Sequence, residues 1–467
     1  MTEKMPGMTP ERIAEICGGS YTGNEEAARI EITGAVLDSR RVEPGMLFLA
    51  AGGERVDGHS FIPAAYEKGA LCVLGEKAPE DTKKPYIRVE DTFAALKKMA
   101  EYYRERLDIT VVGITGSVGK TSTKECIASV LAQKYNVLKT EGNFNNEIGL
   151  PLTVLRLKKE NEVAVLEMGI SDFGEMHRLS QIAKPDLCVL TNIGQCHLEN
   201  LGDRAGILKA KSEIFDFLGE NGTVIVNGDD DMLATIGEVK GKRPIRFGKG
   251  VQNDVYADRI AEKGLLGSRG LFHTGAGEFA AEIPLPGVHM VYNALAATAV
   301  GECLGLSFEQ IQKGLQGVRA IGGRGRIIEA GSLTVIDDCY NANPVSMKAA
   351  LDLLATATGH RTAILGDMFE LGDGEAALHA QIGAYAAKKG IERLCFIGKL
   401  AEHMYREALT VREECPVPNG TIEYYADREA FLSSFTEKPL QNTTVLVKAS
   451  HGMQFEKIVE VLETGQK

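Results

Sequence analysis

A glycine-rich segment constrains the fold of this chain more than any other part of its sequence. It reads Gly113-Ile-Thr-Gly-Ser-Val-Gly-Lys-Thr121, follows the apolar run Ile109–Val112 and precedes a predicted helix at Ser122–Ala132. A strand, a glycine-rich turn, a Lys-Thr pair and a helix together form an arrangement that binds phosphates through backbone N–H groups and the helix N-terminus. Lys120 offers a mobile cation for the β- and γ-phosphates, and Thr121 offers a hydroxyl for Mg²⁺. The segment therefore predicts a site for a nucleoside triphosphate.

The loop is a variant of the usual phosphate-binding pattern. In Gly-x-x-x-x-Gly-Lys-[Ser/Thr] a glycine would stand at position 114, where this chain has Ile114. The alternative is an ordinary glycine-rich turn that carries a surface lysine. The agreement of strand, Gly119-Lys-Thr121 and helix favours the phosphate loop. The residues predicted to bind the nucleotide here are Thr115, Gly116, Ser117, Val118, Gly119, Lys120, Thr121 and Ser122.

Composition narrows the class of protein. Apolar residues make up 44% of the chain and charged residues 25%, which is typical of soluble globular proteins. The net charge of −12 argues against a partner that is a nucleic acid or a membrane surface, because both require a basic face. Nine cysteines without a Cys-x-x-Cys pair fit reduced thiols in a cytoplasm. The N-terminal Met1-Thr-Glu-Lys-Met-Pro6 has no apolar signal core, and we expect a cytoplasmic monomer without membrane insertion.

Hydrophobic periodicity predicts an α/β protein with three domains. Residues 1–88 form a small α/β N-terminal domain, and residues 89–319 form a central domain whose strand–helix alternation predicts a parallel sheet around the P-loop. Residues 320–467 alternate again and predict a Rossmann-like domain. No Gly-x-Gly-x-x-Gly follows its strands, so a dinucleotide cofactor is not expected. Predicted helices include 91–106, 173–183, 204–218, 289–306, 346–355, 375–388, 428–435 and 454–462.

Polar side chains at the ends of predicted central strands should meet the P-loop, because ligands of open α/β sheets bind at the carboxyl edge. Glu167 lies inside the apolar run Val163–Ile170, where an isolated carboxylate needs a partner or a metal. His197 follows the strand that ends near Asn192. With Thr121 they are the candidate ligands of Mg²⁺, although imidazole is an unusual ligand for this ion. The alternative for His197 is a structural hydrogen bond.

Lys211 interrupts an apolar stripe. In the predicted helix 204–218 it stands four residues after Ile207 and four before Phe215, on the face that should be buried. Burial and neighbouring cations would both disfavour its ammonium form. The alternative is a lysine whose stem packs at the edge of the core while its charge reaches solvent.

Motifs in all three units make the sequence closely similar to the Mur ligases. The most specific of them lie in the third unit, and the others surround the P-loop or lie in the first unit. They are Asp38-Ser-Arg40, Asp57-Gly-His59, Thr115–Thr121, Asn143-Phe-Asn-Asn146, Glu167-Met-Gly169, His197-Leu-Glu199, Ala210-Lys211, Gly325-Arg326, Asp337-Asp338, Tyr340-Asn-Ala-Asn-Pro344 and Gly366-Asp-Met-Phe-Glu-Leu-Gly372.

The resemblance implies a ligase that cleaves ATP and joins D-alanyl-D-alanine to a UDP-muramoyl tripeptide through an acyl phosphate, in the synthesis of peptidoglycan precursors. By resemblance the first domain binds the nucleotide sugar and the central domain binds ATP and Mg²⁺. Lys120, Glu167, His197 and Lys211 are then catalytic, with Lys211 carbamylated. The residues implied in substrate binding are Ser39, Arg40, Asn143, Asn145, Asn146, Asn341 and Asn343. The further residues implied in nucleotide binding are Asn293, Arg326 and Asp338.

Two positions depart from the family pattern. Met290 follows His289 where the family has an asparagine, and His451 stands where the family's Lys-Gly-Ser-Arg segment ends in arginine. An anion contact made by that arginine would become weaker and pH-dependent in a histidine. The sequence does not single out the third residue of the peptide, diaminopimelate or lysine, or the base that deprotonates the amine.

Two other functions compete with this interpretation. The first is a P-loop ATPase or GTPase switch, in which the outer domains would bind partners and no amine acceptor would be needed. The second is another amide-forming ligase of the same superfamily, similar to a folylpolyglutamate synthetase. Neither accounts for the run Tyr340–Pro344.

Overall fold

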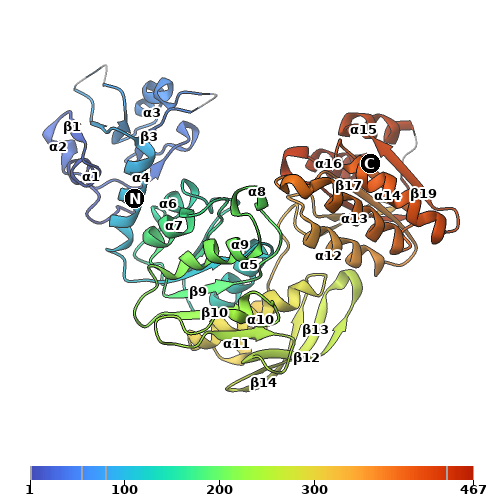
Figure 1. Ribbon diagram of the computed structural model, residues 1–467. Coiled ribbons are helices and arrows are strands. Elements are labelled where there is room, and N and C mark those ends of the chain that lie inside the picture. The colour runs from blue at the N-terminus through green and yellow to red at the C-terminus, as the bar shows by residue number, and fades with distance from the viewer. Residues whose placement is uncertain (1–2, 54–55, 79–80, 82, 438–439, 466–467) are drawn as a thin grey trace.

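The computed structural model describes residues 3–53, 56–78, 81, 83–437 and 440–465, and within them the chain forms three sheets of five, nine and six strands. Each sheet is the centre of one domain, and Figure 1 shows the first and third domains on either side of the central one. The predicted three-domain α/β fold is confirmed. Residues 1–2 and 466–467, at the outer limits of the predicted end domains, lie outside the described part.

The first domain has a small sheet with strand order β1-β5-β4-β3-β2. All neighbours are parallel except β1, which runs antiparallel to β5. The strands are β1 Ser20–Thr22, β2 Ala35–Val36, β3 Leu47–Ala50, β4 Cys72–Gly75 and β5 Tyr86–Arg88. The helices are α1 Pro10–Cys17, α2 Glu25–Ala28 and α3 Ile62–Glu67, and α4 Thr92–Arg104 leads into the central domain.

The central sheet has the order β14-β13-β12-β11-β10-β9-β6-β8-β7, with the P-loop strand β6 between β9 and β8. Its strands are β6 Thr110–Thr115, β7 Val137–Lys139, β8 Val163–Glu167, β9 Leu187–Leu190, β10 Thr223–Asn227, β11 Ile245–Gly248, β12 Val255–Glu262, β13 Ser268–Thr274 and β14 Gly277–Ile283. Its helices are α5 Lys120–Leu131, α6 Gly149–Val154, α7 Glu175–Ala183, α8 Leu198–Leu201, α9 Arg204–Ser212, α10 His289–Cys303 and α11 Phe308–Gln316.

The prediction of a parallel central sheet was wrong at one end. Strands β12, β13 and β14 form an antiparallel meander, and a short turn joins β13 to β14. A parallel pair would need a long crossover, and only residues 275–276 lie between these two strands. The sheet is therefore mixed, with its parallel part surrounding the P-loop.

The third domain is a doubly wound sheet of order β15-β16-β20-β17-β18-β19, parallel except for the β15–β16 hairpin. Its strands are β15 Arg326–Ala330, β16 Leu333–Asp337, β17 His360–Gly366, β18 Arg393–Ile397, β19 Thr421–Tyr425 and β20 Thr443–Lys448. Its helices are α12 Pro344–Ala355, α13 Glu375–Lys388, α14 Ala401–Glu414, α15 Arg428–Glu437 and α16 Glu456–Thr464.

The predicted helix 204–218 was too long. The α-helix α9 ends at Ser212, and a 3₁₀ turn at Glu213–Phe215 follows. The Glu213 carboxylate accepts hydrogen bonds from the backbone N–H groups of Gly174 and His177, at the start of α7. Glu213 thus caps the start of α7 from the 3₁₀ turn that follows α9.

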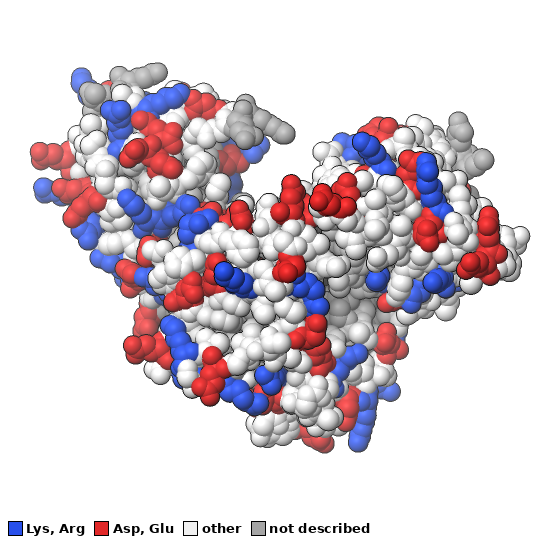
Figure 2. All heavy atoms as spheres, viewed as in Figure 1, with Lys and Arg blue, Asp and Glu red and all other residues white. Residues whose placement is uncertain are grey.

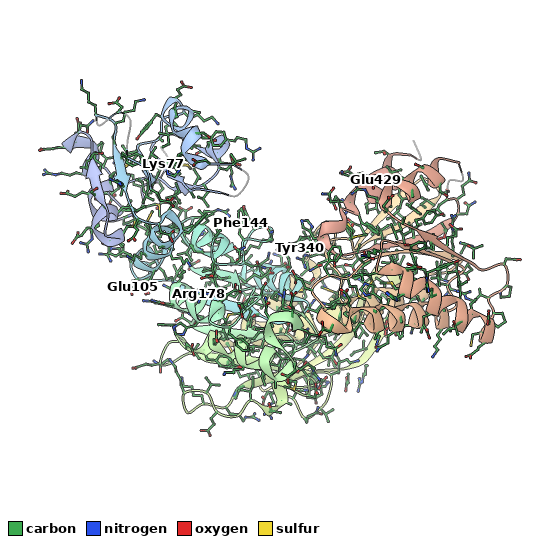
Figure 3. All side chains as sticks on the ribbon, turned by 45° about the horizontal axis from the view of Figure 1, so that its top comes forward. Lys77, Glu105, Phe144, Arg178, Tyr340 and Glu429 are labelled. Carbon is green, nitrogen blue, oxygen red and sulfur yellow. The ribbon has the colours of Figure 1, made fainter. Side chains whose placement is uncertain are left out.

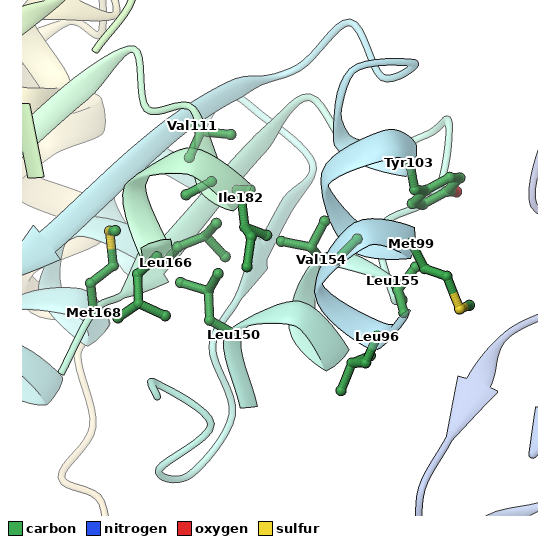
Figure 4. Packing of buried hydrophobic residues seen from close by; sticks show 14 of the residues in the cluster. Leu96, Met99, Tyr103, Val111, Leu150, Val154, Leu155, Leu166, Met168 and Ile182 are labelled. Atoms are coloured by element: carbon green, nitrogen blue, oxygen red, sulfur yellow. The ribbon is translucent and has the colours of Figure 1, made fainter. Parts of the chain in front are cut away.

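One hydrophobic cluster joins the first and central domains, whereas the third domain has clusters of its own. The joint cluster includes Leu47 and Leu74 of the first sheet together with Leu166 and Ile214 of the central domain. Helices α4 and α6 pack against each other in this region, and Figure 4 shows Met99 of α4 beside Leu155. The third domain is packed in two separate clusters on the two faces of its sheet.

The outer surface is hollowed between the first and third domains, above the central domain, as Figure 2 shows. Among the helices of the described residues, none is both long enough and apolar enough to span a bilayer.

Candidate functional site

The P-loop lies at the carboxyl end of β6, in the conformation that its glycines allow. Gly116 has φ +151° and Gly119 has φ +82°, and a Cβ at Gly116 would lie 2.0 Å from the Thr191 hydroxyl. The loop is held by the segment after β9, because Val118 N–H donates to Asn192 Oδ1 (2.9 Å) and the Ser117 hydroxyl donates to the Gly194 carbonyl (3.2 Å). Residues 117–119 of the loop and residues 120–123 in the first turn of α5 line one cavity.

This cavity has a volume of about 480 Å³ and lies between the central and third domains. The predicted site residues in its wall are Ser117, Val118, Gly119, Lys120, Thr121, Ser122, Asn145, Asn146, Glu167, His197, Asn293, Asp338, Asn341 and Asn343. The other predicted residues, which do not line it, are Ser39, Arg40, Thr115, Gly116, Asn143, Lys211 and Arg326. Three segments far apart in sequence therefore converge at the carboxyl edge of the central sheet.

Lys120 and Thr121 begin α5 at the floor of the cavity. The Lys120 ammonium donates to the Gly116 carbonyl (2.8 Å). Burial lowers its pKa, and the nearby Arg324 guanidinium lowers it further against the opposing effect of Glu167. The Thr121 hydroxyl donates to the Glu167 carboxylate, with its oxygens 2.9 and 3.1 Å away.

Glu167 is 1% exposed and collects polar contacts from several elements. Asn145 donates its amide to Glu167 Oε1 (2.8 Å), and the Lys124 ammonium lies 3.6 Å from Oε2 behind the carboxylate. Asn145 thus orients Glu167 in this structure, while Asn146 caps α6 by accepting from the Gly149 N–H group (2.9 Å). Lys124 is fully buried and was not predicted as part of the site.

His197 faces the third domain. Its Nδ1 lies 2.8 Å from a carboxylate oxygen of Glu370, which belongs to the Gly366–Gly372 motif. His197 has φ +51° and Glu370 has φ +63°, so both residues occupy the left-handed region. The His197 side chain lowers the pKa of Glu370. Pairing at Nδ1 leaves Nε2 as the free ring nitrogen of His197.

Lys211 lies beneath the cavity wall and is 1% exposed. Burial lowers its pKa from 10.5 to about 7, and the positive charge of Lys120 contributes to the decrease. Lys211 is therefore buried on α9, as its place in the apolar stripe predicted, although the helix ends one residue later, at Ser212.

The third domain contributes a loop that Lys448 holds. Lys448 is buried, with 2% of its surface exposed. Its ammonium group donates to Asp338 Oδ2 (2.6 Å) and to the Asn341 carbonyl (3.0 Å). Asn343 caps α12 through its side-chain oxygen, which accepts from the Ser346 N–H group (2.9 Å). Lys448 was not predicted as a site residue, since its partners are set only by the tertiary fold.

The departure at position 290 has a visible partner. The Asn293 amide donates to Met290 Sδ (3.2 Å), and Asn293 Oδ1 accepts from the Thr123 hydroxyl (2.9 Å). Met290 is 3% exposed, so its thioether belongs to the packing that orients Asn293.

The linker before the third domain carries two arginines with different surroundings. Arg326, which was predicted as a nucleotide contact, lies 3.5 Å from Asp337 and 3.6 Å from Glu463. Arg324, which was not predicted, lines the cavity instead. Its only sequence signal is its position between Gly323 and Gly325, which both have positive φ.

Ser39 and Arg40 lie in a 3₁₀ turn of the first domain. The Arg40 side chain is 87% exposed and pairs with Asp38 at 2.8 Å. This guanidinium lowers the pKa of Asp38 to about 2. Lys68 fixes the turn by donating to the carbonyls of Ser39 and Arg40.

In the part of the chain that the structure describes, no group of three His, Cys, Asp or Glu side chains is arranged to hold a metal ion. The oxygen atoms of Thr121 and Glu167 that face each other are nevertheless the donor type that Mg²⁺ takes, and Mg²⁺ usually completes its coordination with water and substrate phosphates. The residues therefore fit a magnesium ion that enters with a nucleotide.

The fold and the glycine-rich loop define the class of protein. The chain is a three-domain α/β protein with a nucleotide-binding P-loop at the carboxyl edge of its central sheet. Comparison with protein families then gives three consecutive matches. Residues 31–104 match the Mur ligase family catalytic domain, residues 114–301 the Mur ligase middle domain and residues 323–451 the Mur ligase glutamate ligase domain. The chain belongs to the Mur ligase family.

Full-length relatives agree with this assignment. The chain is 39% identical over 460 residues to the UDP-N-acetylmuramoyl-tripeptide–D-alanyl-D-alanine ligase of Bacillus subtilis, covering 97% of this chain and 98% of the relative. It is similar to a crystal structure of MurF from Acinetobacter baumannii, with TM-score 0.86, 31% identity and coverage of 99% and 100%. It is also similar to the Thermotoga maritima MurF ligase in complex with ADP, with TM-score 0.79, 29% identity and coverage of 92% and 97%.

Proposed function

We propose that this Mur ligase joins D-alanyl-D-alanine to a UDP-N-acetylmuramoyl tripeptide and cleaves ATP to ADP and phosphate. The observation that carries the proposal is the 39% identity along the whole chain to a ligase of this name. Both competing functions would leave the third-domain run Tyr340–Pro344 without a task, yet residues 340–343 of this run line the same cavity as the P-loop. The reaction serves peptidoglycan synthesis in the cytoplasm, and the enzyme acts as a monomer on small-molecule substrates.

The chemistry has two steps that share one active site. A carboxylate oxygen of the tripeptide attacks the γ-phosphorus of ATP, the bond to the β–γ bridging oxygen breaks, and ADP leaves. The acyl phosphate that results has a good leaving group. The dipeptide amine then attacks the carbonyl carbon, loses a proton, and phosphate departs from the tetrahedral intermediate as the amide forms. Such catalysis depends mainly on positioning and on stabilising charge.

Lys120 and the backbone N–H groups of residues 119–122, at the start of α5, hold the triphosphate. Burial lowers the pKa of Lys120, and the negative charge of a bound phosphate would favour the ammonium form. Asn293, Asp338 and Arg326 complete the nucleotide site in the sequence-based proposal. Because Arg326 is paired with Asp337 and Glu463, we assign the phosphate contact at the linker to Arg324.

Thr121, Glu167 and His197 would hold Mg²⁺. The hydroxyl and carboxylate are oxygen donors, and the contact of His197 Nδ1 with Glu370 orients its ring with Nε2 free. A bound magnesium ion supplies neutralisation of the charge on the phosphates. Asn145 fixes the Glu167 carboxylate through its amide.

Lys211 is proposed to be carbamylated. Its buried amine, with pKa about 7, can add CO₂ by forming an N–C bond and releasing one proton to solvent. The modification replaces a cation with an anion that can orient the metal or the γ-phosphate. An unmodified ammonium that contacts phosphate is the competing proposal.

The remaining residues are assigned to the substrates. Ser39 and Arg40 bind the uridine diphosphate end, with the exposed guanidinium as a bidentate anion partner. Asn143, Asn145 and Asn146 are assigned to the tripeptide, although Asn143 does not line the cavity and Asn145 donates to Glu167, and Asn341 and Asn343 are assigned to the dipeptide. The Asn343 side-chain oxygen caps α12 and the Asn341 side-chain oxygen accepts from the Ala342 N–H group (2.9 Å), so their amide NH₂ groups are the donors assigned to the dipeptide.

Acceptor dependence tests the proposed function. Release of phosphate should be fast only when ATP, Mg²⁺, UDP-muramoyl tripeptide and D-alanyl-D-alanine are all present. The control omits the dipeptide alone. An equal rate of ATP hydrolysis without the dipeptide would refute the ligase and favour a switch. A panel of tripeptides with diaminopimelate or lysine at the third position would define the natural substrate.

A further inference from the structure

The linker around Gly323 is docked on the third domain. Gly323 N–H donates to Asp337 Oδ2 (2.8 Å), and Tyr340 N–H donates to the Gly323 carbonyl (2.9 Å). Gly323 has φ +76°, and a Cβ there would lie 3.1 Å from the Tyr340 Cβ. Two backbone contacts therefore fix the residue before Arg324 to the third domain.

Arg324 itself lies on an aromatic ring of the same domain. Its guanidinium carbon is 3.8 Å from the centre of the Tyr340 ring, a distance typical of a strong cation–π contact. Tyr340 lies at the junction of the central and third domains in Figure 3. His451 packs against the same tyrosine, with ring centres 5.3 Å apart. The position of Arg324 is thus set by the third domain, although the residue belongs to the linker.

The guanidinium of Arg324 is not committed to a carboxylate. Within the described ranges it forms no ion pair, in a chain with 64 acidic residues. It lies instead within electrostatic reach of another cation, Lys120. Arg324 and Lys120 thus place two positive charges at one cavity, and guanidinium groups bind phosphate oxygens in a bidentate manner.

The exposed part of the linker precedes Gly323. Val318 is still packed in the core of the central domain, at 2% exposure. Ile321 and Gly322 are exposed, and a Cβ on Gly322 would have no atom within 4 Å. A rotation of the third domain about residues 319–322 would therefore carry Arg324 with it.

We infer that Tyr340 is a positioning residue, whose ring holds Arg324 so that the third domain brings this guanidinium to the γ-phosphate of the nucleotide. The inference rests on the proposed function, because it takes ATP as the ligand of the P-loop. It assigns the Tyr340 ring, and not its hydroxyl, as the functional group. It also predicts that removing the Tyr340 ring weakens nucleotide binding only by releasing Arg324.

Nucleotide binding without turnover tests the inference. The dissociation constants of Mg·ADP and of the Mg²⁺ complex of a non-hydrolysable ATP analogue are measured by calorimetry on the full chain. Tyr340→Leu should weaken the analogue about tenfold and change ADP less than twofold, whereas Tyr340→Phe should retain the affinity for the analogue. Tyr102→Leu is the matched control, because Arg106 lies 3.7 Å over the Tyr102 ring at a place outside the cavity.

A double-mutant cycle separates the inference from the proposed function. Arg324→Ala should weaken the analogue at least as much as Tyr340→Leu, and the double variant should be no weaker than Arg324→Ala alone. Additive losses, or equal losses for ADP and the analogue, would overturn the role of Tyr340. If Arg324→Ala leaves the analogue's affinity unchanged, the phosphate assignment of Arg324 fails as well. The ligase proposal fails separately, through phosphate release that does not depend on the dipeptide.

Discussion

Replacing Lys211 by alanine tests the proposed carbamate most directly. The side chain is 1% exposed and lies on the buried face of α9, with Lys120 as a neighbouring cation. If a carbamate orients the metal or the γ-phosphate, its removal should lower kcat by about 100-fold or more. Acetate, which resembles the lost carboxylate, should restore part of the activity, and short amines should not. Lys209→Ala is the matched control, since Lys209 is exposed on the same helix.

The pKa of Lys211 gives the fraction of its amine that is neutral and can react with CO₂. An ordinary lysine at pH 7 has a neutral amine in roughly 1 in 3,000 molecules. With a pKa lowered to about 7, Lys211 has a neutral amine in about half of the molecules that are not yet modified. Because CO₂ adds only to the neutral amine, the lowered pKa raises the fraction of reactive Lys211 by roughly a thousandfold. The amine becomes protonated as the pH falls below 7, so the carbamate and the activity should be lost in that direction.

The assay combines kinetics with a direct signal. Phosphate release is measured in buffer depleted of CO₂ and again after bicarbonate is added, and wild-type activity should fall and then recover. Enzyme equilibrated with ¹³C-labelled bicarbonate should give a carbamate resonance that Lys211→Ala lacks. Rescue of Lys211→Ala by amines alone, or a variant as active as the wild type, would refute the carbamate. A wild-type spectrum without the resonance would also refute it.

Three other predictions address the site and the fold. Lys120→Ala and Glu167→Ala should each lower kcat about 100-fold or more by removing charge that stabilises the transition state, and near-wild-type turnover would show that the residue is structural. Arg40→Ala should raise the KM for the muramoyl peptide and leave that for ATP nearly unchanged, and the opposite pattern would exclude the first domain from substrate binding. Gly314→Ala would place a methyl group 2.4 Å from Val130 Cα between α11 and α5, so it should lower stability by about 1–3 kcal/mol in thermal unfolding, and an unchanged Tm would contradict this packing.

Strands buried on both faces were predictable from the sequence. The runs at β6, β8 and β9 are continuously apolar because helices cover both sides of a parallel sheet. The strands β12 to β14 were not predicted, although β13 and β14 alternate between buried and exposed residues, and a register shift between Asp258 and Ala261 breaks the alternation in β12. Helix α14 did have a signal that went unread, in the helical spacing of Ala401, Met404, Ala408 and Val411.

The site residues also divide into those that the local sequence predicts and those that only the tertiary structure brings together. Local sequence specifies the P-loop, because strand, glycines and helix start are contiguous. The partners of Glu167 depend on tertiary structure, and only the fold shows that Asn145 donates to it and that Lys124 lies behind it. Arg324 and Arg326 are separated by one glycine, and the sequence pattern does not distinguish them. In the structure Gly323 is docked on Asp337, so that Arg324 lines the cavity and Arg326 lies beside carboxylates.

The hydrophobic cluster shared by the first two domains has a consequence for how the chain unfolds. Leu47 and Leu166 belong to one continuous core, and Lys158 of the central domain also donates to the Thr33 carbonyl of the first (2.9 Å). The two domains should therefore melt as a single cooperative unit, with the third domain as an independent one. Calorimetry of the apoenzyme would then resolve two transitions for three domains, and a saturating nucleotide that bridges the cavity would bring the two together.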